Sequence, residues 1–346
     1  PGQGSQSVGM MKELYDNYAC VREVFKEADE ALGFSMTDLC FKGPEEQLRL
    51  TYNTQPAILT CSIAAMKVLN ENGVFPAVAA GHSLGEYSAL VCAGSLKFAD
   101  AVRTVRKRGQ FMQEAVPVGQ GAMAAIIALD ADKIREICAQ IQDKRNEAVQ
   151  PVNFNCPGQV VIAGATEAVK EACDALKAAG AKRAILLPVS APFHSTLMQP
   201  AADRLKEVLD AIEVADAKIP VIANVTARPE QKGDEIRQVL VKQAASPVLW
   251  EDSVRYMMEN GVDMPRGRVS EADIAAATVG YDLPEGVPVL LFVGRMMWYK
   301  GLRIILDALR LLADGGENFR MVFIGGGADA AEVQEYAKPL GNKCIF

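Results

Sequence analysis

The sequence is poor in histidine, and its cysteines are not spaced as metal ligands. Among 346 residues there are two histidines, His82 and His194, and the eight cysteines include no C-x-x-C pair. A zinc site and a small disulfide framework are therefore not expected, and we predict neither a metal nor a cofactor. Most of the thiols are expected to be buried and reduced.

An excess of positive charge and long apolar runs are also missing. The chain has 36 lysines and arginines against 43 acidic residues, which argues against a nucleic-acid-binding surface. No apolar run approaches the roughly 20 residues that span a bilayer, and the first ten residues lack the basic and apolar order of a signal peptide. These absences predict a cytoplasmic protein with neither nucleic-acid nor membrane partners.

The hydrophobic content of 50% can build a full core, and the pattern is that of a mixed α/β fold. Residues 54–73 are predicted to form a helix with Pro56 in its first turn and Gly73 at its end. Residues 77–81 follow as a buried strand and residues 84–94 as a helix, so Ser83 lies where a strand becomes a helix.

Two further segments have their own patterns. Residues 121–189 follow a β-α-β-β-α-β order, which is typical of a ferredoxin-like subdomain. Residues 264–286 are polar and rich in turn formers, and a new β-α-β-α pattern follows them. We therefore expect a core at 1–120 and 190–263, the inserted subdomain at 121–189, a linker at 264–284 and a partial Rossmann-like fragment at 285–346.

The stretch "GHSLG" at residues 81–85 has the G-x-S-x-G form that exposes a serine hydroxyl on a sharp turn. The alternative is a tight turn with a capping serine. A serine nucleophile needs a base, and histidine suits that work. His82 is adjacent and is expected to point away, which leaves His194, in a loop after the predicted strand 183–189; its alternative is a solvated surface residue.

Arg108 falls on the apolar face of a predicted helix, because positions 101, 105, 108 and 112 share one side. A guanidinium there needs an anionic partner or a route along the surface to water. The functional alternative is a fork that binds a substrate carboxylate through two parallel hydrogen bonds.

These motifs occur in one order along residues 1 to about 263 and closely resemble the bacterial malonyl-CoA:acyl carrier protein transacylases. The segments are "PGQGSQSVGM", "TQPA", "GHSLGEYSALVCAG", "RGQFMQEAVPVGQGAMAAI", "NFNCPGQVVIAG", "PVSAPFHSTLM" and "SPVLWEDSVRYM". The resemblance implies an α/β-hydrolase-like core with the inserted ferredoxin-like subdomain. It also implies that malonyl-CoA and acyl carrier protein are the partners, with CoA and phosphopantetheine thioesters as substrates.

The resemblance implies roles for individual residues. Ser83 would attack the thioester, His194 would act as base and then acid, and Arg108 would bind the malonyl carboxylate. The amides of Gln3 and Leu84 would form the oxyanion hole, and the main-chain oxygen of Gln243 would hold the histidine. The pocket would be formed by His82, Met112, Met123, Asn153, Asn155 and Phe193; the alternative for Asn153 and Asn155 is a structural role in a turn.

The implied reaction is a ping-pong acyl transfer in fatty acid biosynthesis. The Phe193 ring leaves little space for an α-methyl group, so we expect a preference for malonyl over methylmalonyl units. Carrier proteins are acidic, which makes Lys182 with Arg183, or Arg103 with Lys107, candidates for a docking patch; the alternative is that both pairs are simply solvated.

Residues 264–346 resemble part of the nucleotide-binding domain of a GT-B family 4 glycosyltransferase. Arg295 and Lys300 match the positions that contact the donor diphosphate. The family's first strand, its closing turn and helix, and the acceptor domain of the glycosyltransferase are not found, so the chain resembles either a genuine fusion or an artificial joining of two fragments. We expect such a chain to be less stable than an intact transacylase.

Other functions are alternatives to the transacylase hypothesis. The same serine and histidine could serve an esterase or thioesterase, although Arg108 and Gln243 argue against it. An inactive chimera that only binds a carrier protein is a third possibility. For residues 264–346 we predict no measurable binding of UDP- or GDP-sugars.

Overall fold

A computed structural model describes residues 1–189, 191–262, 287–293, 296, 302–324, 327 and 329–346. The fold is mixed α/β, and the chain divides into two compact units, Pro1–Asp263 and Met264–Phe346. No helix within these described ranges is both long and apolar enough to cross a membrane.

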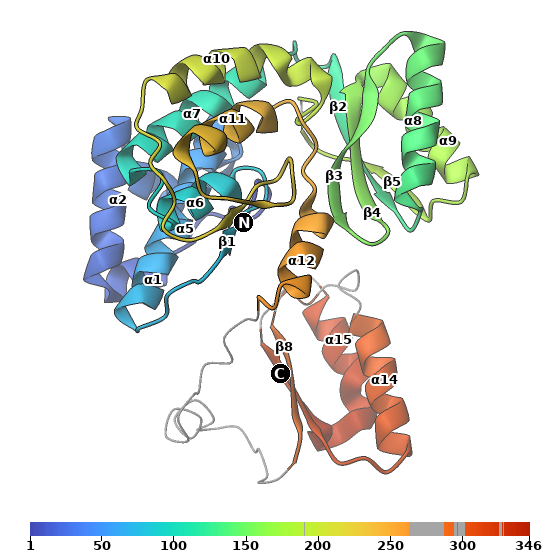
Figure 1. Cartoon of the computed structure of the whole chain (residues 1–346). Coiled ribbons are helices and arrows are strands. Elements are labelled where there is room, and N and C mark those ends of the chain that lie inside the picture. Colours follow the sequence, from blue (N-terminus) through green and yellow to red (C-terminus); the bar gives the residue numbers. More distant parts are fainter. Residues whose placement is uncertain (190, 263–286, 294–295, 297–301, 325–326, 328) are drawn as a thin grey trace. The chain divides into compact units, whose positions relative to one another are not determined.

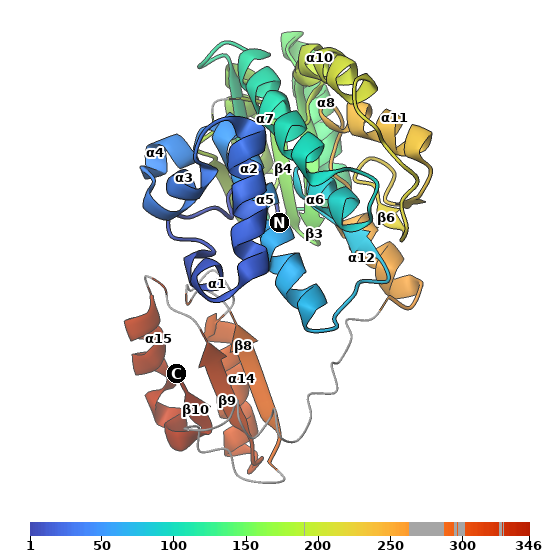
Figure 2. The same ribbon diagram turned by 90° about the vertical axis from the view of Figure 1, so that its left-hand side faces the viewer.

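The larger part of the first unit is built from helices. The long helix α5 packs against α2 and α7, and α7 in turn packs against α10 (Figures 1 and 2). The bounds are α1 Lys12–Asn17, α2 Ala19–Leu32, α3 Met36–Lys42, α4 Glu45–Leu48, α5 Thr51–Glu71, α6 Gly85–Cys92, α7 Phe98–Glu114, α10 Gln199–Asp210, α11 Gly233–Gln243 and α12 Trp250–Glu259, with a 3₁₀ turn at Thr196–Met198.

Helix α5 begins at Thr51, three residues before the predicted start, so Pro56 lies inside the helix and not in its first turn. Proline has no N–H and cannot bond to the carbonyl four residues earlier, which belongs to Tyr52. The Nη1 atom of Arg106 on α7 donates to that carbonyl at 3.4 Å. A side chain from a neighbouring helix therefore compensates for the missing hydrogen bond.

The strand that precedes Ser83 is short. β1 spans Ala79–Ala80, both only partly buried, where a buried strand over 77–81 was predicted. It pairs in parallel with β6 (Val221–Ile222), which pairs antiparallel with β7 (Pro229–Glu230). This small sheet brings residue 224, just after β6, next to the turn after β1.

The segment from residue 121 to residue 186 forms a four-stranded antiparallel sheet. Its elements are β2 Gly121–Ile127, α8 Ala131–Arg145, β3 Val149–Cys156, β4 Gln159–Ala165, α9 Thr166–Ala178 and β5 Arg183–Leu186. The strand order is β3-β4-β2-β5. Consecutive elements thus alternate in the β-α-β-β-α-β order that the sequence predicts.

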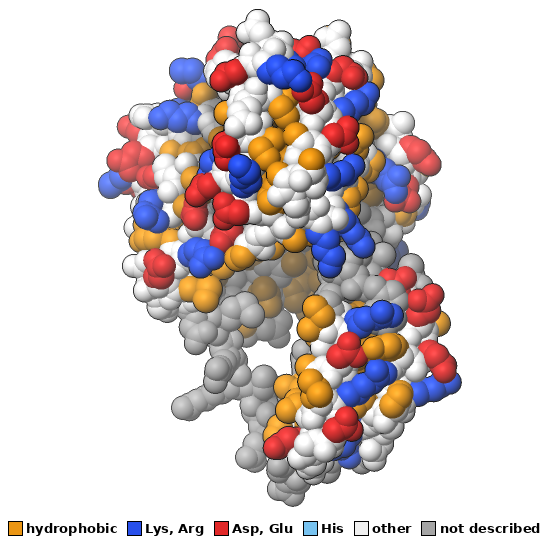
Figure 3. All heavy atoms as spheres, turned by 90° about the vertical axis from the view of Figure 1, so that its right-hand side faces the viewer, with side chains coloured by type: hydrophobic (Ala, Val, Ile, Leu, Met, Phe, Trp, Pro, Cys, Tyr) orange, Lys and Arg blue, Asp and Glu red, His pale blue; other side chains and the backbone are white. Residues whose placement is uncertain are grey.

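The two faces of this sheet pack in two different apolar clusters. Along β2, Ala124 and Ile126 face α8 and α9, whose buried side chains form one core with them. Met123 points to the opposite face and packs with Val161 and Phe193. Figure 3 views the side that carries α8 and α9 and shows basic and acidic side chains interspersed there. One face of the sheet is therefore covered by helices, and the other contributes to a second apolar cluster that contains Phe193.

The second unit has a three-stranded parallel sheet in the order β10-β9-β8. Its described elements are β8 Val289–Val293, α14 Leu302–Asp314, β9 Arg320–Ile324, α15 Ala330–Ala337, a 3₁₀ segment Lys338–Lys343 and β10 Cys344–Ile345. The buried face of α14 carries Leu302, Leu306 and Leu309, which follow a helical spacing. Strands and helices alternate along the described part of this unit.

Candidate functional site

Ser83 lies on a sharp turn between β1 and α6. Its φ is +52°, in the left-handed region that is uncommon for a residue other than glycine. Gly81 permits the turn, since a Cβ there would lie 1.9 Å from the carbonyl carbon of Gly85. The Asn224 side chain holds both sides of the turn: its Oδ1 accepts from the Ser83 amide at 2.6 Å, and its Nδ2 donates to the Gly81 carbonyl at 2.7 Å.

His194 meets the hydroxyl of Ser83, although 111 positions separate the two residues. The Oγ of Ser83 lies 2.7 Å from Nε2 of the histidine, and the carbonyl oxygen of Gln243 lies 2.9 Å from Nδ1. A carbonyl can only accept, so Nδ1 carries the proton and Nε2 is free to accept the serine proton. Like Ser83, His194 has a positive φ, of +63°.

The histidine is buried and neutral. Burial, with the nearby charge of Arg108 as the second cause, lowers the pKa of His194 to about 3. At neutral pH the ring is therefore in the form that accepts a proton from a hydroxyl.

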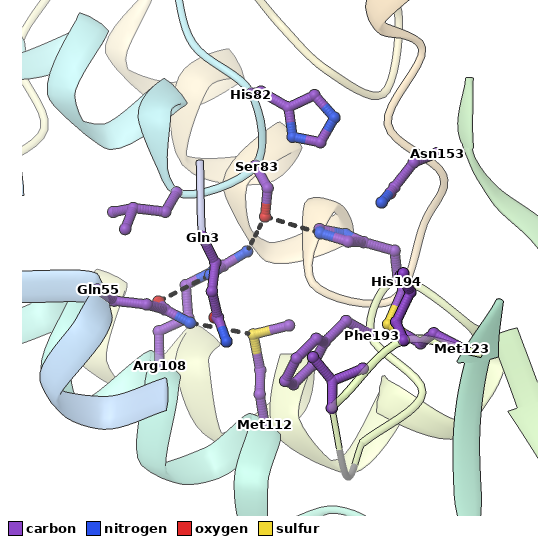
Figure 4. A pocket seen from close by; sticks show the side chains of 13 residues that line it. Gln3, Gln55, His82, Ser83, Arg108, Met112, Met123, Asn153, Phe193 and His194 are labelled. Carbon is purple, nitrogen blue, oxygen red and sulfur yellow. Dashed lines mark hydrogen bonds between the residues drawn. The ribbon is translucent and has the colours of Figure 1, made fainter. Parts of the chain in front are cut away.

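Arg108 on α7 is 1% exposed and lies on the other side of the serine hydroxyl (Figure 4). Its Nη2 donates to the Ser83 Oγ at 3.1 Å and to the Gln243 Oε1 at 2.9 Å, and its Nη1 donates to the Gln55 Oε1 at 2.8 Å. All three partners are uncharged, and the Nε has no partner among the described residues. A buried guanidinium without a bonded anion favours the binding of a carboxylate.

A cavity of about 120 Å³ opens beside these groups. It is lined by Gln3, Gln55, His82, Ser83, Leu84, Arg108, Met112, Met123, Asn153, Leu187, Val189, Phe193 and His194. No acidic side chain is among these lining residues. The cavity therefore combines one cation and one nucleophile with an apolar wall.

The two residues expected to form an oxyanion hole both line this cavity. Leu84 directly follows the serine and precedes the first turn of α6, and Gln3 comes from the N-terminal segment. Neither backbone amide donates to another group among the described residues. Free amides beside a nucleophile can stabilise a developing negative charge on a carbonyl oxygen.

The remaining predicted pocket residues differ in their positions. The Nε2 of His82 contacts the Oδ1 of Asn155 at 2.9 Å, and burial lowers the pKa of this histidine. Asn153 lines the cavity, whereas Asn155 contacts it through His82. Met112, Met123 and Phe193 belong to its apolar wall, and Met112 contacts Gln55 (Figure 4).

Several residues that sequence reasoning missed hold this arrangement together. Gln55 binds Arg108, Asn224 holds the serine turn, and Glu86 is a carboxylate buried beneath it. Signals for two of them were present: Glu86 is an acid inside the apolar helix "GEYSALVC", and Asn224 is a polar residue at the end of the apolar run "VIA". Both are polar residues where the pattern calls for apolar ones.

The other predicted sites lie apart from this cavity or outside the described ranges. Lys182, Arg183, Arg103 and Lys107 are exposed, and Arg103 pairs with Asp100 at 2.8 Å. Arg295 and Lys300 lie outside the described residues. No group of three or more potential ligands among the described histidines, cysteines and acids could hold a metal ion.

A serine on a strand-to-helix turn, bonded to a histidine and an arginine, is the arrangement of a serine-dependent acyl-transfer site. Residues 1–264 match the family model of the acyl transferase domain, and residues 274–346 match that of glycosyl transferases group 1. The chain therefore belongs to the acyl transferase domain family.

Individual relatives narrow the class. The malonyl CoA-acyl carrier protein transacylase of Escherichia coli K12 is 54% identical over 264 residues, which cover 76% of this chain and 85% of that protein. The solved transacylase of Coxiella burnetii has a TM-score of 0.74 and 47% identity, covering 76% of this chain and 83% of that one. A malonyl-transacylase in complex with a type II PKS acyl-carrier protein has a TM-score of 0.74 and 50% identity, with coverage of 76% and 84%. Within the family, residues 1–264 thus group with the malonyl CoA-acyl carrier protein transacylases.

Proposed function

We propose that the first unit transfers a malonyl group from malonyl-CoA to the phosphopantetheine thiol of an acyl carrier protein, through an ester on Ser83, in fatty acid synthesis. The observation that carries this proposal is Arg108, a buried cation 3.1 Å from the Ser83 hydroxyl whose hydrogen-bond partners are all uncharged. An acyl group with a free carboxylate at its far end matches this site, because the acid would complete the hydrogen bonds of the guanidinium.

In the first half-reaction the Ser83 Oγ gives its proton to the Nε2 of His194 and attacks the thioester carbonyl. The new C–O bond forms, negative charge develops on the carbonyl oxygen, and the amides of Gln3 and Leu84 stabilise it. The C–S bond then breaks, and His194 returns the proton to the departing CoA sulfur.

The second half-reaction repeats these steps in reverse. His194 takes the proton of the carrier thiol, the sulfur attacks the ester carbon, and the C–O bond to Ser83 breaks. The serine oxygen recovers its proton from His194. The same groups serve both directions, as microscopic reversibility requires of one pocket.

Substrate binding would also change the pKa of the catalytic base, His194. The positive charge of Arg108 is one cause of the low pKa of His194. A malonyl carboxylate on Arg108 would offset that charge and raise the pKa of the histidine, which makes it a stronger base when substrate is present. The same carboxylate therefore contributes to recognition and to activation of the serine.

The apolar wall supports selection among diacids. Phe193, Met112 and Met123 line the cavity beside Arg108 and His194. An extra α-methyl group would have to fit against this wall, and one methyl in an apolar pocket discriminates by roughly 10- to 200-fold. We infer a preference for malonyl over methylmalonyl groups of this order.

The finer architecture follows the same proposal. We infer an α/β-hydrolase-like core, with residues 121–186 as a ferredoxin-like subdomain; the strand order β3-β4-β2-β5 supports the subdomain assignment.

The complex of a similar transacylase with an acyl-carrier protein supports a carrier protein as the partner of this chain. Lys182 with Arg183, and Arg103 with Lys107, are the exposed basic pairs proposed to meet it.

The test is an exchange assay with labelled malonyl-CoA. We expect label on the carrier thiol, with slow release to water. A serine esterase, the alternative function, would release label to water and leave the carrier protein unlabelled. That second outcome would overturn the proposal.

A further inference from the structure

Glu86 is a buried acid for which the reaction described above has no use. It is the second residue of α6, 1% exposed, and its helical neighbours Tyr87, Ala89 and Leu90 are buried and mostly apolar. A carboxylate in such surroundings is stable only when hydrogen bonds satisfy it. Two N–H groups do so, both on Oε2: the backbone amide of Asn224 at 3.0 Å and the Nε2 of Gln243 at 2.8 Å.

Each of these two donors belongs to a residue that holds part of the site. Asn224 bonds to the Ser83 amide and to the Gly81 carbonyl, so it holds the strained turn from both sides. The position of the Asn224 side chain depends on its own backbone, which Glu86 binds. One oxygen of Glu86 is therefore two hydrogen bonds away from the turn that exposes the nucleophile.

Gln243 makes the other connection. Its side-chain Oε1 accepts from Arg108, its Nε2 donates to the Ser83 carbonyl at 2.8 Å, and its main-chain oxygen accepts from His194. A guanidinium can only donate, so the Oε1 of Gln243 must face Arg108 and its Nε2 must face Glu86. This amide orientation requires an acceptor at position 86.

We propose that Glu86 is a positioning residue of the transfer reaction. Through its Oε2 atom it fixes the positions of the Ser83 turn, Arg108 and His194 relative to one another. The proposal rests on the function proposed above. Glu86 touches neither substrate nor the reacting atoms and acts through Asn224 and Gln243.

Protonation of Glu86 would disturb this network. A proton on Oε2 would oppose the two N–H groups that meet there, and a proton on Oε1 would leave Oε2 as an uncharged, weaker acceptor for them. Arg108 of α7 favours the carboxylate, Glu230 of β7 opposes it, Tyr87 of α6 stays neutral, and His194 is linked through Gln243. Burial is the largest effect and raises the pKa of Glu86 to about 7. We therefore expect transfer to fall as the pH drops through about 7, and we assign this expected acid-side limb to Glu86, since the pKa of His194 lies near 3.

The experiment compares Glu86→Gln and Glu86→Ala with the parent chain in two assays. The first is the pH profile of kcat/KM for malonyl transfer, and the second is the rate at which phenylmethylsulfonyl fluoride labels Ser83. Glutamine keeps an oxygen acceptor without a titrating proton, so we expect it to retain activity within about 10-fold and to move the acid-side midpoint to lower pH. Alanine removes the acceptor, and we expect a loss of about 100-fold or more in both assays.

Ser95→Ala is the control, because Ser95 is buried and its hydrogen bonds among the described residues, to Ala215 and Leu90, do not reach the site. It should change neither assay by more than a few-fold. An acid-side midpoint that is the same in Glu86→Gln and the parent chain would overturn the proposal, as would a Glu86→Ala variant with normal labelling. If the parent chain labels with the sulfonyl fluoride yet transfers no malonyl group, the proposed function fails, and the labelling rates still test Glu86.

Discussion

Under the proposed function, Arg108 is the residue expected to determine which acyl group the site accepts. It is the one cation among the cavity-lining residues, and three neutral oxygens hold it within reach of the serine. A ligand carboxylate would be the first anion bonded to it. The charge of the acyl group, and not its length alone, should therefore control the rate of acyl transfer.

Replacing Arg108 with alanine should reduce the preference for malonyl-CoA over acyl-CoA substrates without a carboxylate. Loss of a buried, hydrogen-bonded charge partner costs about 3–4 kcal/mol, so kcat/KM for malonyl-CoA should fall by about 100- to 1,000-fold. Acetyl-CoA, which has no carboxylate, should lose much less. Steady-state kinetics with both thioesters measure the ratio, with Arg49→Ala, an exposed arginine paired with Glu45, as the control. An unchanged ratio would remove Arg108 from substrate recognition.

Glu86 and His194 have opposite effects on the pH dependence of stability. The raised pKa of Glu86 means that, between pH 7 and 4.5, the folded protein binds a proton that the unfolded chain does not. Its contribution is fully present below pH 4.5 and is lost as the pH rises through 7. The lowered pKa of His194 has the reverse effect, and its contribution is lost as the pH falls from 6.5 to about 3.

Glu86→Gln should remove the contribution of Glu86 to the pH dependence of stability and leave that of His194. As the pH falls from 7 to 4.5, the free energy of unfolding of the parent chain should rise relative to that of the variant by about 3 kcal/mol. Urea titrations at several pH values measure this difference. Parallel pH curves for the two chains would show that Glu86 does not titrate in this range.

At the scale of elements, the short strand, the turn and α6 form the part that presents the nucleophile. Gly81 lies so close to the start of α6 that a Cβ would lie 1.9 Å from the Gly85 carbonyl carbon and oxygen. Relief requires a shift of backbone, because no flexible side chain is the obstacle. The turn geometry and the position of α6 are thus coupled.

Gly81→Ala should therefore destabilise the first unit by about 3 kcal/mol or more and abolish transfer even where the variant remains folded. Thermal unfolding and malonyl transfer provide the two measurements. Gly315→Ala in the second unit is the matched control, because the nearest atom to a Cβ there is 3.3 Å away. A fully active Gly81→Ala chain would contradict the close approach.

Helices were easier to predict from the sequence than the strand before Ser83. Helix α8 has a local start signal, because the Asp130 side chain before it accepts from the amides of residues 132 and 133. The start of α5 was misplaced because Arg106 compensates for Pro56 by donating to the Tyr52 carbonyl, a contact between residues 54 positions apart in the chain. Likewise, β1 is short because its pairing depends on β6, about 140 residues later.

Within the site, local motifs pointed to the candidate reactive groups but not to the residues that hold them in place. Ser83 and His194 could be proposed from a turn motif and the scarcity of histidine. Their support comes from Asn224, Gln55 and Glu86, which lie on separate segments and have no shared motif. Hydrogen bonds between distant segments depend on the tertiary fold, so spacing along the chain does not reveal them.

At the scale of the whole molecule, the described cavity residues all belong to the unit Pro1–Asp263. The unit Met264–Phe346 has its own core around Leu306, Phe319 and Val333. Two units with separate cores are expected to unfold as separate cooperative steps.

Removal of residues 264–346 should therefore leave transfer nearly intact. We expect kcat/KM within about three-fold of the full chain and a thermal midpoint of the first unit within about 3 °C. Calorimetry and the exchange assay measure both. Loss of activity on removal would show that the first unit depends on the second.

The central claim is that Ser83 carries the malonyl group between two thiols. Brief incubation of the full chain with malonyl-CoA, followed by intact-mass measurement and peptide mapping, tests it most directly. The account predicts a mass gain of one malonyl group on the peptide that contains Ser83, lost again on addition of carrier protein thiol and absent in Ser83→Ala. A chain that gains no mass, or that gains it equally in Ser83→Ala, would contradict the account.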